Sequence, residues 1–195
     1  MTRPLTSDQA GAAPDAALLV AYGNGDRAAG RELVARLGPR ALGYATRMLG
    51  DRAEAEDVVQ EAMLRLWKQA PAWRQGEAQV GTWLYRVVSN LCIDRIRARR
   101  PGPPLDQVPD PADATPAAVD RLADRDRAQA LETALLALPE RQRQAVVLRH
   151  LEGLSNSEIA EVMDINVAAV ESLTARGKRA LARALSGRRE ELGYG

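Results

Sequence analysis

The chain has 195 residues, with 27 lysines and arginines against 26 acidic residues, and its single cysteine and histidine leave almost no room for disulfides or a metal site. It contains no membrane span, signal peptide, Gly-rich phosphate loop or paired nucleophile and base. We therefore expect a soluble cytoplasmic protein that is not an enzyme and binds no cofactor. Aromatic residues are scarce, so the core must be Leu, Val and Ala, which favours an all-α fold.

The small net charge hides a strong pattern along the chain. Residues 81–100 carry a net charge of +4, residues 101–126 carry −4, and residues 166–189 carry +5. Two basic segments that flank an acidic one are typical of a protein with two phosphate-facing surfaces. The pattern predicts nucleic-acid binding at two places.

A proline-rich stretch divides the chain. Residues 99–116 contain six prolines and almost no apolar periodicity, which indicates an extended linker. We therefore expect a short N-terminal segment, a helical module, a linker and a second helical module, with bounds at 1–14, 15–100, 101–116 and 117–190.

The first module reads as four helices. Asp15 opens a short one that ends near Gly23, and a second runs from about 26 to 49, where Gly38-Pro39 should kink or interrupt it. The third follows the apolar periodicity of Ala55, Val58, Val59, Ala62 and Leu66, and Pro71 stops it. The fourth starts after Gly81, with Thr82 as a plausible N-cap, and ends at Pro101.

The second module also reads as helices. Thr115-Pro116 is a good helix start, and Leu131, Leu135 and Leu138 continue an apolar stripe. Pro139 begins another helix that Gly153 closes. Ser155 and Glu158 have the spacing of a capping box, and the last long helix follows residues 164–166.

Residues 156–173 fit a helix-turn-helix. Ala160 is small where the second helix must cross, and Asp164 occupies a turn that favours a left-handed residue. The apolar positions that would hold the two helices are Ile159, Met163, Ile165, Val170 and Leu173. An ordinary αα-hairpin fits the same pattern, but the basic run from Arg176 to Arg183 favours DNA binding.

The fourth helix carries a polar row at spacings of four, four and three: Arg86, Asn90, Asp94 and Arg97. Asn and Arg hydrogen-bond base edges, and Trp73, Trp83 and Tyr85 could stack on unpaired bases. The alternative is that Trp83 is core and the arginines form a solvated face. Cys92 is expected in the core, and His150 is assigned no role.

The order of the motifs resembles the bacterial extracytoplasmic-function (ECF) sigma factors, a group of the sigma-70 family. The matching segments span roughly residues 15–185: AEAEDVVQEAMLRLW, GTWLYRVVSNLCIDRIRAR, the Pro-rich linker and LPERQRQAVVLRHLEGLSNSEIAEVM. The resemblance implies a sigma-2 helical bundle and a sigma-4 helix-turn-helix, which bind core RNA polymerase and direct promoter-specific initiation. It also implies an anti-sigma factor that responds to stress, and a linker that threads towards the RNA exit path.

The resemblance assigns roles to individual residues. The surface that docks on the polymerase β′ clamp would comprise Asp57, Gln60, Glu61, Met63 and Trp67. The residues that melt and read the −10 element would be Trp73, Arg74, Trp83, Arg86, Asn90 and Arg97, with Asn90 at the position that holds a flipped-out base. Arg95, Arg97, Arg99 and Arg100 would contact backbone phosphates.

The −35 reader departs from the common pattern, because Glu171 and Leu173 stand where many relatives have basic residues. The expected DNA contacts are therefore Ser172, Thr174, Arg176, Lys178 and Arg179. The alternative function is a stand-alone helix-turn-helix regulator, which would not need the acidic face of the third helix. A sigma factor would instead have two partners, which are core RNA polymerase, through its β and β′ subunits, and promoter DNA.

Overall fold

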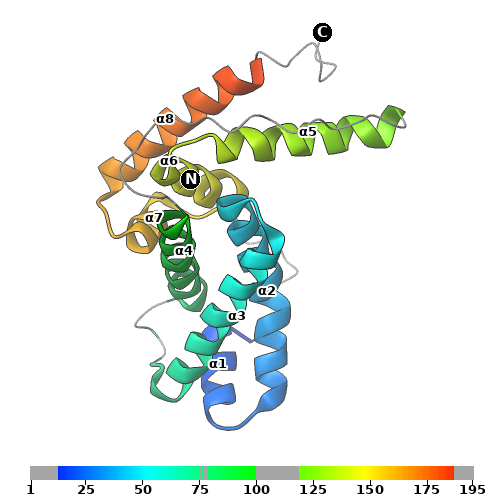
Figure 1. The fold of residues 1–195 in the computed structure, drawn as a ribbon. Helices are drawn as coiled ribbons and strands as arrows, with labels where there is room; N and C mark the ends of the chain where they lie inside the picture. Colours follow the sequence, from blue (N-terminus) through cyan, green and yellow to red (C-terminus); the bar gives the residue numbers. More distant parts are fainter. Residues whose placement is uncertain (1–12, 75, 77–78, 100–118, 187–195) are drawn as a thin grey trace.

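Helices are the only regular structure in the part of the chain that the computed structural model describes, residues 13–74, 76, 79–99 and 119–186 (Figure 1). The first half contains α1 (Asp15–Gly23), α2 (Arg27–Leu49), α3 (Arg52–Gln69), the 3-10 turn η1 (Ala70–Ala72) and α4 (Val80–Ala98). The second half contains α5 (Val119–Leu136), α6 (Glu140–Val146), the π turn η2 (Val147–Leu151), α7 (Asn156–Met163) and α8 (Val167–Ser186). The prediction of an all-α fold is confirmed.

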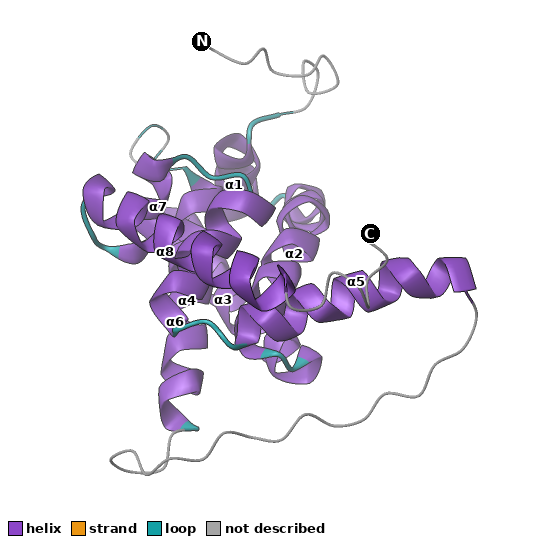
Figure 2. Ribbon diagram, turned by 90° about the horizontal axis from the view of Figure 1, so that it is seen from above, coloured by secondary structure: helices purple, strands orange, loops and turns teal. Residues whose placement is uncertain are grey.

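The two halves lie one above the other in Figure 1, with α1–α4 below and α5–α8 above. Helix α4 packs on α7, and Figure 1 shows it running up into the second half; Figure 2 gives the same helices seen from above. No helix within the described residues is long and apolar enough to cross a lipid bilayer.

Helix α2 is continuous through Pro39, so the predicted interruption at Gly38-Pro39 is wrong. Proline removes one backbone donor, and this loss is outweighed by burial of a stripe that continues on both sides of it. Leu33, Leu37, Ala41, Tyr44 and Met48 form this stripe at helical spacing. The helix ends as expected near 49, at Gly50 in the left-handed conformation with φ 70°.

Helices α3 and α4 follow the prediction except at their ends. The predicted stripe of α3 is buried at Ala55, Val58, Ala62 and Leu66, and Pro71 lies in η1 directly after it. Helix α4 begins at Val80, with Gln79 as N-cap, so the prediction of Thr82 as N-cap is wrong. The earlier start lets Val80 bury its side chain in the core.

In the second half the local signals act as predicted. Ser155 and Glu158 form a reciprocal capping box, and Asp164 adopts the left-handed conformation with φ 53°. The Asn166 side chain then accepts a hydrogen bond from the Ala169 N–H at 2.8 Å and caps α8. Pro139 is the N-cap of α6 rather than its first residue. The expected helix start at Thr115-Pro116 lies outside the described residues.

Helices α7 and α8 form the helix-turn-helix. Ile159, Met163 and Val170 are buried between them, and the partly buried Ala160, Ile165 and Leu173 complete the contact. On its other side α8 crosses α6 at the buried Gly177. These contacts fix which face of α8 remains on the surface.

A single continuous core joins the two halves. The cluster of buried apolar side chains runs from Leu19, Tyr44 and Val88 in the first half to Leu148 and Ile159 in the second. Helices that precede the linker therefore pack against helices that follow it.

Candidate functional site

An apolar groove of about 670 Å³ lies between α2 and α3. Its α2 wall consists of Val34, Ala35, Gly38, Pro39 and Leu42, and its α3 wall consists of Glu56, Val59, Gln60, Met63, Leu64 and Trp67. Val34 and Leu64 are 45% and 49% exposed and lie on the two walls of the groove, which makes it a contiguous apolar patch on the surface. The sequence reasoning missed these two residues, although an apolar Leu64 at an otherwise exposed helical position was a usable signal.

Three of the five residues predicted to bind polymerase line this groove, and the other two lie outside its lining on the same helix. Gln60, Met63 and Trp67 line it, while Asp57 is exposed on the same helix and Glu61 accepts a hydrogen bond from Arg65 at 2.9 Å. The indole of Trp67 is half-buried because it packs on Tyr22, with ring centroids 4.4 Å apart. The result is an apolar floor with acidic side chains on its α3 side.

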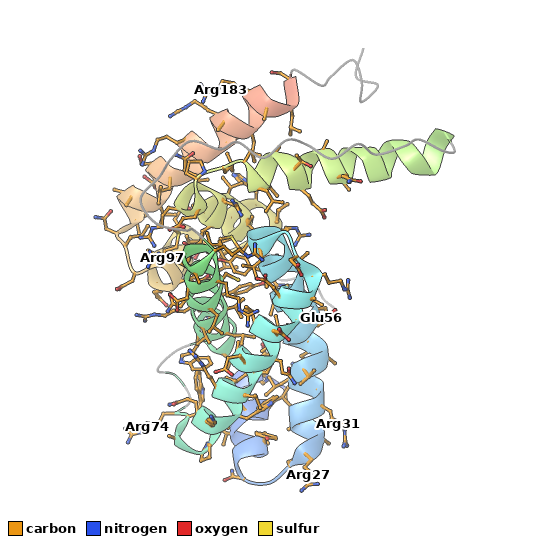
Figure 3. All side chains as sticks on the ribbon, in the orientation of Figure 1. Arg27, Arg31, Glu56, Arg74, Arg97 and Arg183 are labelled. Atoms are coloured by element: carbon orange, nitrogen blue, oxygen red, sulfur yellow. The ribbon has the colours of Figure 1, made fainter. Side chains whose placement is uncertain are left out.

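Helix α4 carries the predicted polar row on its surface. Arg86, Asn90, Asp94 and Arg97 are all exposed, whereas Val88, Ser89 and Cys92 are buried on the opposite side. Arg97 also faces the second half, where its guanidinium lies 3.8 Å from the Glu140 carboxylate (Figure 3). The row can therefore present donors and acceptors to a strand of nucleic acid.

The aromatic residues near α4 do not share one exposed platform. Trp73 and Trp83 are half-buried and contact each other edge to face, with centroids 6.1 Å apart. Tyr85 is buried and directs its hydroxyl towards the second half. Arg74 is exposed after η1, at the far end of the molecule from α8 (Figure 3). Stacking by Tyr85 is incompatible with its burial here.

Two of the arginines expected to contact phosphates are engaged inside the first half. Arg95 donates to the Glu54 carbonyl at 2.6 Å, and Arg99 donates to the Leu49 carbonyl at 3.0 Å and pairs with the Glu54 carboxylate at 2.5 Å. They hold the end of α4 against the junction of α2 and α3. Arg100 lies outside the described residues.

Helix α8 divides the predicted −35 residues between two faces. Ser172, Arg176 and Arg179 are exposed, and Arg183 continues their face one turn further (Figure 3). Thr174 has its hydroxyl buried, whereas Lys178 is exposed and borders a small pocket with Leu131 of α5 and His150. The exposed Glu171 carboxylate accepts from the Asn156 side chain at 3.4 Å, across to α7. The surface face of the helix is thus cationic towards its C-terminal end.

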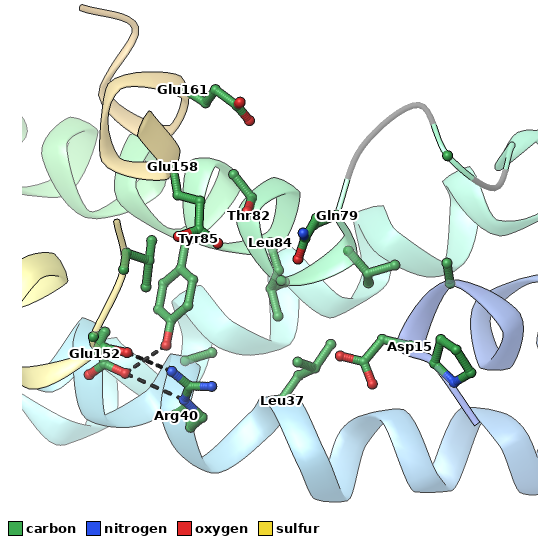
Figure 4. Close-up of a pocket in the computed structure, with 18 residues that line it drawn as sticks. Asp15, Leu37, Arg40, Gln79, Thr82, Leu84, Tyr85, Glu152, Glu158 and Glu161 are labelled. Carbon is green, nitrogen blue, oxygen red and sulfur yellow. Dashed lines mark hydrogen bonds and ion pairs between the residues drawn. The ribbon is translucent and has the colours of Figure 1, made fainter. Parts of the chain in front are cut away.

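The interface between the halves centres on the buried Glu152 (Figure 4). The Tyr85 hydroxyl donates to Glu152 Oε2 at 2.6 Å, and Arg47 pairs with Oε1 at 3.3 Å. Arg40 pairs with Oε2 at 3.8 Å and donates to the Glu152 backbone carbonyl at 2.7 Å. Burial and the neighbouring carboxylate raise the pKa of Tyr85, so its hydroxyl stays protonated and can donate.

Beside this cluster, Arg143 of α6 is almost fully buried and reaches the C-terminal end of α2. It donates to the carbonyl of Met48 at 2.5 Å and to the carbonyls of Leu136 and Leu138 at 2.7 and 3.2 Å. No sequence signal distinguished Arg143 or Glu152, because their partners lie far away in the chain.

The remaining titratable groups in the interior do not form a reactive centre. The Tyr44 hydroxyl shares a hydrogen bond of 2.7 Å with Ser89, and burial raises its pKa. Burial also raises the pKa of the Cys92 thiol to about 12, which keeps it protonated and unreactive. Within the described residues no group of three or more metal-ligating side chains comes together.

Two family models match the chain, one in each half. Residues 33–101 match the model described as Sigma-70 region 2, and residues 128–181 match Sigma-70, region 4. The first match contains the groove and the polar row of α4, and the second contains the helix-turn-helix.

Characterised proteins and solved structures give the same result. The ECF RNA polymerase sigma factor SigM of Mycobacterium tuberculosis is 37% identical over 174 residues, which cover 88% of this chain and 84% of SigM. SigW of Bacillus subtilis is 35% identical over 71% of this chain and 79% of its own length. The structure of CnrH in complex with the cytosolic domain of CnrY aligns with a TM-score of 0.67 at 26% identity, covering 89% of this chain and 97% of CnrH.

Proposed function

We propose a division of labour for this chain, which belongs to the ECF RNA polymerase sigma factors of the sigma-70 family: its first half binds core polymerase and opens the −10 element, and its second half reads the −35 element. The observation that carries the proposal is the presence, in one chain, of an exposed apolar groove and of a helix-turn-helix with a cationic outer face. The chain itself catalyses no reaction and acts in the cytoplasm, where polymerase works.

The groove between α2 and α3 would bind the clamp helices of the polymerase β′ subunit. Its apolar floor at Val34, Met63 and Leu64 suits the apolar face of a helix, and the carboxylates of Asp57 and Glu61 suit basic residues beside that face. The half-buried Trp67 would contribute aromatic contact area. Its side chain would lose little conformational entropy on binding, because it already packs on Tyr22.

The exposed row of α4 would bind the single strand of the −10 element. Asn90 stands between Arg86 and Asp94, one helical turn from each, so it can hydrogen-bond a base that has left the stack while Arg86 contacts a phosphate. Arg74, Trp73 and Trp83 would border this strand at the start of the helix.

The outer face of α8 would enter the major groove of the −35 element. Among the predicted contacts, the exposed candidates are Ser172, Arg176, Lys178 and Arg179. Thr174, whose hydroxyl is buried, would contribute only if its packing changes on binding, and Lys178 could contact a phosphate beside α5. The carboxylate of Glu171 could accept a hydrogen bond from a cytosine amino group once it leaves Asn156.

An inhibitory partner is a further part of the proposal. CnrH was solved in complex with the cytosolic domain of CnrY, and we propose that an anti-sigma factor likewise restrains this chain until a stress signal releases it. The groove and the two DNA-binding faces are the surfaces that such a partner would cover.

The competing function is a stand-alone helix-turn-helix regulator, and core binding separates the two. The purified chain would be mixed with core polymerase and, separately, with promoter duplex, and each complex would be measured by gel filtration. A sigma factor forms a complex with core and binds duplex weakly by itself. Tight duplex binding without any complex with core would favour the regulator.

A further inference from the structure

The interface between the halves contains a charged cluster that a permanent domain contact does not require. Its centre is the Glu152 side chain, which is only 5% exposed and interacts with Arg40, Arg47 and Tyr85 of the first half. A buried carboxylate is favourable only while its partners stay in place, because desolvation of the charge costs free energy. Such a contact is sensitive to small changes, which suits an interface that opens.

All three partners reach Glu152 from helices of the first half. Arg40 of α2 and Tyr85 of α4 are shown beside Glu152 in Figure 4, and Arg47 also comes from α2. A second contact between the halves is the hydrogen bond that Arg143 of α6 donates to the Met48 carbonyl at the end of α2. A third contact is the ion pair between Arg97 of α4 and Glu140 of α6. Arg97 is one of the candidate DNA-binding arginines. Closing the halves therefore engages one group, the Arg97 guanidinium, that DNA binding would need.

Closed halves cannot serve the two promoter elements together. By their numbering, the −10 and −35 elements are about 25 base pairs apart, which is roughly 85 Å of duplex at about 3.4 Å per base pair. In the structure α4 packs directly on α7, and α7 packs on the DNA-reading helix α8. The 16 residues from 101 to 116, which can extend to roughly 55 Å, are long enough to let the halves separate.

We propose that the Glu152 cluster is an intramolecular latch that holds the free protein closed and limits its activity until core polymerase and promoter separate the halves. The α2–α3 groove lies outside the latch, so the closed protein can still present it to core. Partners that bind only the open form then shift the population towards it. The functional part of this inference rests on the proposed function, whereas the latch itself does not.

Two conservative variants of the full chain test the latch. Tyr85→Phe removes one hydroxyl, and Glu152→Gln removes the charge while keeping the shape. Each loses a hydrogen bond to a charged group, so the equilibrium constant for closing should fall about tenfold or more. Glu161→Gln is the matched control, because Glu161 is an exposed acid of α7 that lines the same pocket as Arg40, Tyr85 and Glu152 (Figure 4).

Small-angle X-ray scattering and run-off transcription would be measured on the same preparations, after circular dichroism has verified equal helix content. We expect a radius of gyration several ångströms larger for both latch variants, and severalfold more transcript from a promoter with both elements at limiting protein. The control should match the wild type in both measurements.

The outcomes separate the parts of the inference. An unchanged radius of gyration in both variants would overturn the latch. A larger radius with no gain in transcript would overturn its inhibitory role. If the variants open but neither they nor the wild type bind core, the latch stands and the proposed function is wrong.

Discussion

Gly177 of α8 lies so close to Val146 of α6 that a Cβ at position 177 would stand 2.5 Å from Val146 Cγ2. The backbone carbonyl of Gln142 would be 3.2 Å from the same atom. This contact sets the distance between α8 and the body of the second half, and with it the position of the exposed face of α8.

Replacing this glycine should therefore destabilise the second half. Gly177→Ala should lower the free energy of unfolding by about 1–3 kcal/mol, because overpacking outweighs the higher helix propensity of alanine. Urea denaturation followed by circular dichroism measures the change. Gly81→Ala is the control: it lies in α4 with open space around its Cβ and should be neutral or slightly stabilising.

The cause can be checked in a double variant. Val146→Ala removes the methyl group that the new Cβ would meet, so the double variant should lose less stability than the two single variants together. Strict additivity would contradict the assigned contact.

The polar row of α4 should affect promoter opening more than duplex binding. Asn90→Ala should reduce open-complex formation about 5–100-fold, the equivalent of roughly 1–3 kcal/mol for one lost base contact. Permanganate footprinting of unpaired thymines measures opening, and Arg31→Ala, an exposed cation on α2, serves as the control. Normal opening by the Asn90 variant would remove Asn90 from the site.

The cations of α8 should contribute to −35 binding chiefly through phosphate contacts. Arg176→Ala and Arg179→Ala should each weaken binding of the holoenzyme and reduce the slope of log K against log salt by about 1. A fluorescence anisotropy titration at several salt concentrations gives the slope. A variant that loses discrimination between −35 sequences with an unchanged slope would instead indicate direct base reading by that arginine.

Stability should fall at alkaline pH because of three buried acids. The folded state holds the Cys92 thiol protonated up to about pH 12, whereas the unfolded thiol ionises near 9. Stability is therefore complete below pH 9 and falls above it, by about 1.4 kcal/mol per pH unit for each such group. Burial raises the pKa of Tyr44 and Tyr85 as well, so they add to the fall above pH 10.

Urea denaturation between pH 8 and 11 measures this dependence, and Cys92→Ala should make it shallower. An equal slope in the variant, or labelling of native Cys92 by iodoacetamide at pH 8, would contradict its assignment as a protonated core thiol.

Local features of this fold could be predicted from sequence because they depend on neighbours in the chain. The capping box at Ser155, the left-handed Asp164 and the exposed row of α4 all follow from spacing and residue type. The continuous α2 could not, because the burial that carries the helix through Pro39 is tertiary.

The contact between the halves could not be predicted from the sequence either, because it joins residues that are far apart in the chain. Tyr85 and Glu152 are 67 positions apart, and periodicity shows which face of a helix is apolar but not which helix covers it. The burial of the Tyr85 hydroxyl is therefore a feature of the tertiary structure, as is the placement of Val34 and Leu64 in one groove. Gly177 did carry a signal, since a glycine inside a helical pattern often marks a close approach.

Core-dependent transcription tests the central claim most directly. The wild type and a variant carrying Asp57→Ala, Glu61→Ala and Leu64→Ala would be compared in run-off transcription with purified core on a library of promoters. We predict promoter-specific transcripts with the wild type and a loss of at least tenfold with the variant, while its stability and helix content stay close to wild type. Full transcription by the variant would contradict the groove as the polymerase-binding surface, and the absence of any specific transcript with the wild type would contradict the assigned function.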